Sequence, residues 1–400
     1  MDRFVQSKPD PESFDYLVVG AGLSGSVVAN QIATRHPDKT VLVVDKRDHI
    51  GGNCYDYTDL HTGIRINKYG AHLFHTNSKR VWDFVAPLAT WIRWDHRVIA
   101  NVEGHGLVNL PININTVNRL CDTNIQTADE MQAWIDSNGH NNTSEEENGE
   151  TVVVKKVGRH IYNLLFKEYT FKQWNKYPSS LHSSVLARIP VRTNHDDRYF
   201  SDRYQALPKE GYTAIFEKLL EPDNITVSLS TDFHQWSQFN PNNLANGINI
   251  NTNKKPIIIY TGPIDHYFSQ VGYPALEYRS ISFKKETIRN CEYYQPNSVV
   301  NYPGKDVNYT RIVEYKHFLD NPTNSPDTII VSETTNDHGD PYYPVPNKKN
   351  SSLYAQYQQL SLQLQDKYPI HFLGRLATYK YLNMDQAILA ALEWCEREIV

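Results

Sequence analysis

A glycine-rich turn near the start of the chain has the residue types that bind the phosphates of a dinucleotide. Gly20-Ala-Gly22-Leu-Ser-Gly25 follows an apolar, β-branched run at 15–19 and precedes a segment with helical character. Gly20 permits a tight turn, Gly22 lets the backbone approach a pyrophosphate, and Gly25 permits close packing of helix on strand. The N–H groups at the start of the helix attract anions. The pattern predicts a strand, turn and helix that cradle a diphosphate.

A carboxylate ends the next predicted strand, at 40–45. In this position Asp45 would accept hydrogen bonds from ribose hydroxyls and would repel a 2′-phosphate, so we expect NADP to be excluded. The alternative is a glycine turn that binds no ligand. The acidic residue at the end of the second strand favours the dinucleotide.

Two further glycine and arginine pairs extend the predicted phosphate site. Arg47 precedes the pair Gly51-Gly52, and Gly374-Arg375 follows a strand-like run near the other end of the chain. Each pair can bring a cation and bare backbone amides to a diphosphate, although a surface turn explains either pair alone equally well. A dinucleotide contacted by both ends of the chain is typical of large FAD-binding folds.

Composition indicates a folded protein that binds small molecules. The 400 residues are 40% hydrophobic and 21% charged, with a formal net charge of −5, which argues against a nucleic-acid surface. No apolar run is long enough to span a membrane, and the polar N-terminal stretch does not resemble a secretory signal. The four scattered cysteines predict neither disulfides nor a metal site, so we expect a cytoplasmic protein. The 26 tyrosines suit a pocket for sugars or bases.

Periodicity predicts the other elements. We expect helices over 81–94, 111–133 and 155–174 and from residue 384 onward, and strands over 256–262, 280–283, 298–301, 310–314 and 371–374. Two asparagine-rich segments, 138–150 and 239–255, are predicted to be loops. The pattern indicates a dinucleotide fold interrupted by a helical insert and a β-sheet insert.

Ten short blocks resemble the short, bacterial-type UDP-galactopyranose mutase family, in order and at the expected spacing from about residue 14 onward. They are residues 47–53, 68–76, 169–174, 187–192, 199–204, 260–265, 276–279, 309–314, 341–344 and 374–381. The resemblance implies an α/β fold in which an FAD-binding Rossmann-like domain carries an inserted helical domain and an antiparallel β-sheet domain. It assigns 1–96, 212–272 and 346–400 to the FAD-binding domain, 97–111, 186–211 and 273–345 to the sheet domain, and 112–185 to the helical domain.

The resemblance also implies an activity. The family interconverts UDP-galactopyranose and UDP-galactofuranose with reduced FAD and no net redox change, through a flavin N5–sugar adduct and an iminium. It further implies a UDP-galactose substrate, an external reductant such as NAD(P)H, a homodimer and a role in making cell-surface glycans. The alternatives are a related mutase acting on UDP-N-acetylgalactosamine or dTDP-fucose, an FAD-dependent oxidase, and a non-catalytic dinucleotide-fold binding protein.

Site residues follow from the matching blocks. The resemblance implies catalytic roles for Arg188, Arg311, His75 and Tyr381, and substrate contacts for Tyr169, Thr170, Trp174, Tyr199, Arg279, Asn301 and Tyr343. It assigns cofactor contacts to Gly20, Gly22, Leu23, Gly25, Asp45, Lys46, Arg47, Gly52, Asn53, His72, Leu73, Gly374, Arg375 and Met384, and no metal ligands. One position departs from the family pattern. Asn383 stands where many members carry aspartate, and an amide cannot act as a carboxylate base.

Overall fold

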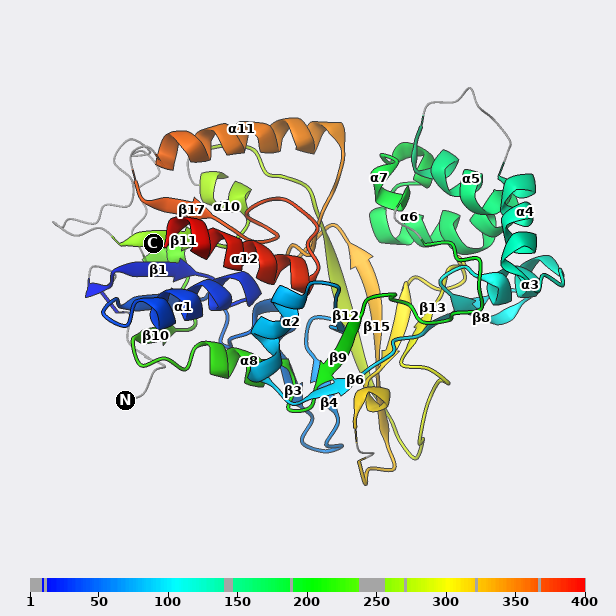
Figure 1. The fold of residues 1–400 in the computed structure, drawn as a ribbon, viewed down its shortest axis with the longest axis horizontal. Coiled ribbons are helices and arrows are strands. Elements are labelled where there is room, and N and C mark those ends of the chain that lie inside the picture. Colours follow the sequence, from blue (N-terminus) through cyan, green and yellow to red (C-terminus); the bar gives the residue numbers. More distant parts are fainter. Residues whose placement is uncertain are drawn as a thin grey trace.

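The described residues form three structural units (Figure 1). The computed structural model describes residues 9–10, 13–139, 147–187, 190–236, 256–269, 272–320, 323–365 and 368–399. A parallel sheet flanked by helices lies on one side of the molecule, a long sheet runs through the middle, and a group of helices lies on the far side. None of the described helices combines the length and the apolar character needed to cross a membrane.

The parallel sheet confirms the predicted Rossmann-like unit. Its five strands lie in the order β10 (Ile225–Ser228), β2 (Val41–Val44), β1 (Tyr16–Val19), β11 (Ile257–Tyr260) and β17 (Ile370–Phe372), and every pair is parallel. The helices α1 (Leu23–Arg35), α8 (Tyr212–Leu219) and α12 (Met384–Glu398) share one core with this sheet. The helices α10 (Ile264–Ser269) and α11 (Lys348–Gln365) share the core on its other face.

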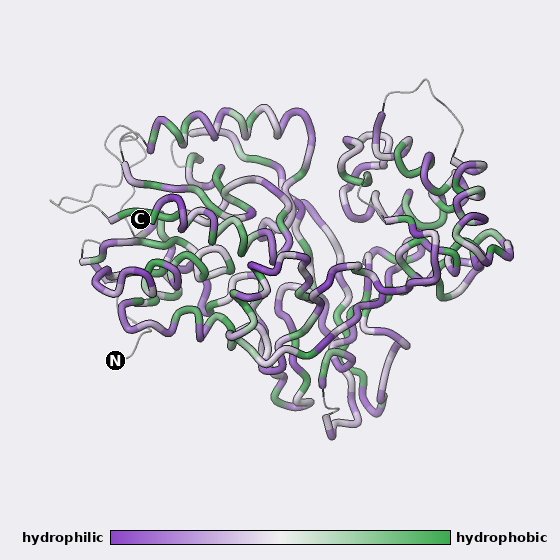
Figure 2. Tube along the Cα trace, viewed as in Figure 1, coloured by the Kyte–Doolittle hydropathy of each residue, from purple (hydrophilic) through white to green (hydrophobic). Residues whose placement is uncertain are grey.

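Burial on both faces explains why these strands are continuously apolar. In β2, Val41 and Val43 enter the core under α1, whereas Leu42 and Val44 enter the core under α10 and α11. Side chains alternate between the faces of a strand, so a sheet covered on both sides needs an apolar residue at every position. Figure 2 shows these strands as largely hydrophobic.

The second sheet has seven strands, in the order β16 (Tyr343–Pro344), β12 (Tyr278–Ile288), β15 (Thr328–Asn336), β14 (Arg311–Glu314), β13 (Val299–Asn301), β7 (Val98–Val102) and β8 (Gly106–Leu110). All neighbouring pairs are antiparallel except β7 with β13, which is parallel. The predicted antiparallel sheet is therefore confirmed, with one parallel pair between β7, which precedes the helical unit, and β13, which follows it much later in the chain. The strand β15 and the helix α11 were not predicted from the sequence.

The helical unit comprises α3 (Ile114–Cys121), α4 (Ala128–Asn138), α5 (Gly149–Ile161), a π-helical segment (Tyr162–Lys167), α6 (Glu168–Trp174) and α7 (Ser184–Ala187). Its core continues onto β7 and β8. The predicted helix over 111–133 is two helices, because Asp122 adopts a left-handed conformation (φ 51°) and Thr127 caps the start of α4. Of the predicted loop over 138–150, residues 140–146 lie outside the described residues and Gly149 and Glu150 already belong to α5. Of the second predicted loop, 239–255, no residue is described.

The predicted helix over 81–94 was wrong in its second half. The helix α2 (Lys79–Val85) ends in a short 3₁₀ helix that contains Pro87, and β6 (Trp91–Arg93) follows. Proline stops the helix, and β6 then pairs with β9 (Tyr204–Pro208), which also pairs with β5 (Phe74–Thr76). A separate hairpin joins β3 (Asp56–Thr58) and β4 (Arg65–Asn67), and a short helix α9 (Phe233–Trp236) follows β10. Further 3₁₀ turns lie at Gly52–Cys54, Pro178–Ser180 and Tyr315–Phe318.

Candidate functional site

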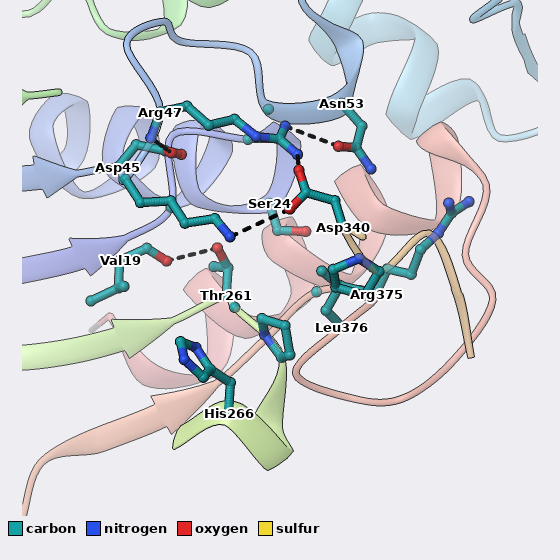
Figure 3. Close-up of a pocket in the computed structure, with 18 of the residues that line it drawn as sticks. Val19, Ser24, Asp45, Arg47, Asn53, Thr261, His266, Asp340, Arg375 and Leu376 are labelled. Carbon is teal, nitrogen blue, oxygen red and sulfur yellow. Dashed lines mark hydrogen bonds and ion pairs between the residues drawn. The ribbon is translucent and has the colours of Figure 1, made fainter. Parts of the chain in front are cut away.

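A cleft of about 600 Å³ lies at the carboxyl ends of the parallel strands (Figure 3). The ends of β1, β2 and β11 supply Val19, Val44 and Tyr260, and loops from both ends of the chain close its sides. This is the edge at which ligands bind in open parallel sheets. Twelve of the fourteen predicted cofactor residues line the cleft: Gly20, Gly22, Leu23, Asp45, Lys46, Arg47, Gly52, Asn53, His72, Gly374, Arg375 and Met384.

Gly25 and Leu73 are the two predicted cofactor residues that are not among the lining residues. A Cβ atom on Gly25 would lie 1.9 Å from the carbonyl oxygen of Gly20. Gly25 therefore serves the close approach of α1 to the preceding turn, which is the packing role that its spacing predicts.

The glycine turn forms a backbone cradle that fits a dinucleotide diphosphate. A Cβ atom on Gly52 would lie 2.8 Å from the Cα of Gly22, so the two glycine backbones meet at the cleft wall. A Cβ atom on Gly22 would meet no described protein atom closer than 3.7 Å, so it would project into the cleft. Gly22 caps α1 without any side-chain hydrogen bond to the first turn, which leaves the helix N–H groups for a ligand. These features fit the diphosphate of FAD.

Asp45 braces the glycine turn. Its Oδ2 accepts a hydrogen bond from the amide of Ala21 at 2.8 Å, and its Oδ1 accepts one from the amide of Arg47 at 2.9 Å. Each carboxylate oxygen has a further lone pair that can accept from a ribose hydroxyl. The predicted ribose contact stays a prediction.

An ion-pair network crosses one side of the cleft (Figure 3). Asp340, in the loop before β16, receives the Arg47 guanidinium at 2.9 Å and the Lys46 ammonium at 3.6 Å, and Arg47 also donates to Asn53 at 3.0 Å. Burial raises the pKa of Asp340, but the two cations outweigh burial and hold this pKa below its usual value. Sequence reasoning missed Asp340, whose one signal is its position directly before the block at 341–344.

The two ends of the chain meet beside the cleft. A Cβ atom on Gly374 would lie 3.0 Å from the Oγ of Ser24 at the start of α1. Arg375 donates from Nε to the carbonyl of Leu382 at 3.1 Å, and its guanidinium lies 4.7 Å from the ring centre of Tyr381. The Tyr381 ring stacks in turn on Tyr343, with 5.6 Å between the ring centres.

Three polar residues lie side by side on the central sheet. Asn301 on β13 is paired with Arg311 on β14, and Arg311 is paired with Glu333 on β15. Arg311 Nε lies 2.7 Å from Glu333 Oε2. Burial lowers the pKa of Arg311, but Glu333 and the nearby Tyr343 and Tyr169 outweigh burial and raise it above its usual value. Sequence reasoning missed Glu333; its available signal is a carboxylate within the β-branched run of β15.

Two of the predicted tyrosines, Tyr169 and Tyr343, are near enough to Arg311 to affect its pKa. Burial raises the pKa of Tyr169, on α6, above its usual value, with Tyr199 among the smaller contributors. Burial and the neighbouring Tyr381 raise the pKa of Tyr343 to about 12. The site thus combines a permanent cation with neutral phenol donors, which suits a diphosphate in a partly dry pocket.

The structure describes most, but not all, of the predicted site residues on and near the helical unit. Thr170 is buried on α6, and Trp174 at its end packs against the helical core. Arg279 is buried, donates to the carbonyl of Gln173 at 2.8 Å and pairs with Asp337, so its guanidinium caps the end of α6. Its predicted substrate contact stays a prediction. Arg188 lies outside the described residues.

Two predicted histidines flank Phe74. The Nδ1 of His72 lies 2.8 Å from the carbonyl of Gly70 and therefore carries the proton, which leaves Nε2 as an acceptor. Burial, with smaller contributions from the positive charges of Arg375 and Arg311, lowers the pKa of His72 to about 4 against the raising effect of its hydrogen bond to Gly70. The charge on His72 is thus affected both by Arg375, near the C-terminal end of the chain, and by Arg311, on the central sheet.

His75 has a different environment. Its Nδ1 lies 3.1 Å from Asp202, and its ring stacks on Phe200 with 3.7 Å between the ring centres. A third histidine, His96, is buried next to the same phenylalanine. Burial lowers the pKa of His96 to about 3, with smaller contributions from Arg311 and His75.

Comparisons with known proteins agree with this architecture. Residues 164–381 match the family model described as UDP-galactopyranose mutase, and residues 18–88 match a model of NAD(P)-binding Rossmann-like domains. A solved structure titled reduced UDP-galactopyranose mutase superposes with a TM-score of 0.74, covering 97% of this chain and 94% of that one. At 15% identity this likeness concerns the fold alone.

Curated relatives extend the match over nearly the whole chain. A probable UDP-galactopyranose mutase of Klebsiella pneumoniae is 37% identical, covering 94% of this chain and 92% of its own. A dTDP-fucopyranose mutase of Escherichia coli is 34% identical, covering 94% and 96%. A UDP-galactopyranose mutase of Mycoplasma genitalium is 33% identical, covering 95% and 94%. On the family-model match and these near full-length relatives, the chain belongs to the UDP-galactopyranose mutase family.

Proposed function

We propose that this protein interconverts UDP-galactopyranose and UDP-galactofuranose with FAD bound in its reduced form. The observation that carries the proposal is Arg311, a partly buried cation with tyrosines nearby and within electrostatic reach of His72, which lines the dinucleotide cleft. An oxidase of small amines or alcohols would have no use for a second diphosphate site beside its cofactor. Membership of the family supports the same activity.

FAD would lie in the cleft at the ends of the parallel strands. The backbone at Gly22 and the first turn of α1 would hold its diphosphate, and Asp45 would hold the adenosine ribose. Gly374 and Arg375, from the other end of the chain, complete the cleft, as expected of an FAD-binding fold. Bound and reduced, FAD supplies the electron-rich group on which the exchange at the sugar depends.

The chain's own residues would bind the nucleotide and stabilise its charge. As the bond between the anomeric carbon and the phosphate breaks, negative charge grows on the departing UDP, and Arg311 lies ready to stabilise it. Neutral Tyr343, Tyr199 and Tyr381 would donate hydrogen bonds without adding buried charge. On the helical side, Tyr169 would stack on the uracil and Thr170 and Trp174 would complete the pocket, with Asn301 at the uracil edge. We assign Arg188 a second contact to the diphosphate.

The decisive experiment incubates dithionite-reduced protein with UDP-galactofuranose and separates the products by anion-exchange chromatography. We expect UDP-galactopyranose to form only after reduction, with the oxidised protein as the control. Oxygen consumption with substrate would instead identify an oxidase. Protein that holds FAD but gives no product would contradict this substrate, and protein without FAD would indicate a binding protein.

A related substrate is the second candidate, because the E. coli relative at 34% identity is named dTDP-fucopyranose mutase. The same cation and tyrosines would serve a thymidine diphosphate sugar. Parallel incubations with dTDP-fucofuranose and UDP-N-acetylgalactosamine distinguish the candidates by their kcat/KM values. We expect the highest value for the UDP-galactose pair.

We also propose a cytoplasmic homodimer that receives electrons from NAD(P)H and supplies galactofuranose for cell-surface glycans. The four free cysteines, two of them buried, suit a reducing compartment. Light scattering of the purified protein tests the dimer. Anaerobic bleaching of the flavin by NADH or NADPH tests the reductant.

A further inference from the structure

A lysine in the last turn of α6 is bonded to three backbone carbonyls of the central sheet. The Nζ of Lys172 lies 2.5 Å from the carbonyl oxygen of Tyr302, 2.9 Å from that of Tyr309 and 3.3 Å from that of Val307. An ammonium has three N–H donors and no acceptor, so these contacts use its full donor capacity. Lys172 thus joins the helical unit to the loop over residues 302–310.

That loop is the turn of a hairpin whose two strands carry predicted nucleotide contacts. Asn301 ends β13 immediately before the loop, and Arg311 begins β14 immediately after it. The rings of Tyr302 and Tyr309 pack edge to face within the loop, with their centres 4.9 Å apart, so the loop is held compactly. A shift of the loop would therefore move both Asn301 and Arg311.

Further contacts hold the same end of α6. The carbonyl of Lys172 accepts hydrogen bonds from the Thr335 hydroxyl and, at 3.4 Å, from Arg279, which also donates to the carbonyl of Gln173. The last carbonyls of a helix have no partners within it, so these donors satisfy groups that would otherwise be left without a bond. The side chain of Lys172 adds the tie to the hairpin, which Thr335 and Arg279 do not provide.

Burial and nearby acidic residues have opposite effects on the pKa of Lys172. Burial lowers the pKa of Lys172 to about 8, against the raising effect of Asp306 in the loop and of Glu168 one turn earlier on α6. Burial raises the pKa of Tyr302 to about 12 and also raises that of Tyr309, and Arg279 is a permanent cation. The pKa of Lys172 therefore lies closer to neutral pH than those of Tyr302 and Tyr309 in the loop that it contacts.

We propose that Lys172 is a positioning residue that sets the distance between the uracil-facing side of α6 and the hairpin bearing Asn301 and Arg311. The inference rests on the proposed function, since both surfaces must close on one nucleotide. Tyr169 lies three residues before Lys172, on the same helix. Loss of the tie would let the two halves of the nucleotide site separate, and the affinity for UDP would fall while the chemistry at the sugar would change less.

The test measures UDP binding by calorimetry, and KM and kcat for UDP-galactofuranose, in Lys172→Met and in the control Lys167→Met. Lys167 is exposed at the end of the π-helical segment before α6 and makes no hydrogen bond to the hairpin among the described residues, so its replacement removes the same charge from the same part of the chain. We expect about tenfold weaker UDP binding and a raised KM in Lys172→Met, a much smaller change in kcat, and no change in the control. Stoichiometric FAD in the purified variant shows that the distant cofactor cleft is folded.

The wild-type protein and Lys172→Arg provide a second measurement that does not depend on the methionine variant folding. Between pH 7 and 8.5, the affinity of the wild type for UDP-galactose should fall about threefold as Lys172 loses its proton. Arginine stays protonated, so Lys172→Arg should show a flat profile. Unchanged binding in Lys172→Met, or identical pH profiles in the wild type and Lys172→Arg, would overturn the positioning role. A wild type that does not bind UDP would overturn the proposed function itself.

Discussion

Arg311 and Glu333 face each other on adjacent strands of the central sheet, with Nε and Oε2 2.7 Å apart. Glu333 is 2% exposed, and its second oxygen, Oε1, is buried without a hydrogen-bond partner among the described residues. A buried carboxylate is costly unless a cation compensates it. The pair therefore fixes the guanidinium of Arg311 on the sheet and leaves its remaining N–H groups to bind a ligand.

Replacing Glu333 with glutamine should lower the catalytic efficiency, because Glu333 orients Arg311. The side chain keeps its size but loses the charge that orients the guanidinium, and we expect kcat/KM to fall about tenfold to a hundredfold, or ~1.4–2.7 kcal/mol. Steady-state kinetics with reduced enzyme measure the loss. The control is Glu286→Gln on the neighbouring strand β12, where the carboxylate is 43% exposed and pairs with Lys284. Equal kinetics in the two variants would contradict the role of Glu333.

Gly22→Ala should remove FAD without unfolding the chain. Gly22 has a φ of −83°, which alanine adopts freely, and the added Cβ would meet no described protein atom closer than 3.7 Å. The Cβ would instead occupy the space proposed for the diphosphate. We expect an FAD content well below that of the wild type and a melting temperature of the cofactor-free protein within a few degrees of it. An alanine variant that retained full FAD would place the diphosphate elsewhere.

Asp340→Asn should speed the release of FAD. Asp340 holds the side chains of Lys46 and Arg47 in place beside the cleft. Because the substitution removes the charge that orients these two cations, we expect the dissociation rate of FAD to rise about tenfold. Fluorescence of the released flavin after dilution measures the rate. Asp48→Asn, which removes one exposed carboxylate from the loop that carries Arg47, is the matched control. If both variants release FAD equally fast, net charge rather than the network governs retention.

Acid should destabilise the protein through the buried His96 and the partly buried His72 and His234. The pKa is lowered by burial to about 3 for His96 and to about 4 for His72 and His234, against 6.5 for the unfolded chain. Below pH 6.5 the unfolded state therefore binds protons that the folded state does not. The free energy of unfolding is highest above pH 6.5 and falls toward pH 3–4, by up to about 1.4 kcal/mol per pH unit for each histidine.

Urea unfolding between pH 7 and 4 measures this slope in the cofactor-free protein. His96→Asn should reduce the slope by the contribution of one histidine, because the amide does not titrate in this range. The comparison variant is His338→Asn, at an exposed position. Parallel curves for the wild type and His96→Asn would show that His96 is protonated in the folded state.

Local patterns predicted the dinucleotide unit well. The strand at Tyr16–Val19, the glycine turn, α1 and Asp45 are recognisable within thirty residues, because the turn and the start of the helix depend on near neighbours. The two arginine and glycine pairs were also located in the sequence, although more than 320 residues separate them. Where partners came from far along the chain, prediction failed: Trp91–Arg93 is a strand because β9 pairs with it, and β15 is the strand that receives both β12 and β14.

The sequence by itself therefore determined the phosphate-binding turn and, through its ten blocks, the family and most candidate site residues. Only the tertiary structure placed Glu333 opposite Arg311, Asp340 between Lys46 and Arg47, and Lys172 against the hairpin after Asn301. The physical reason is that each of these contacts joins residues separated by tens to hundreds of positions. Strand register and domain packing bring these distant residues into contact. Neither leaves a local signal in the chain.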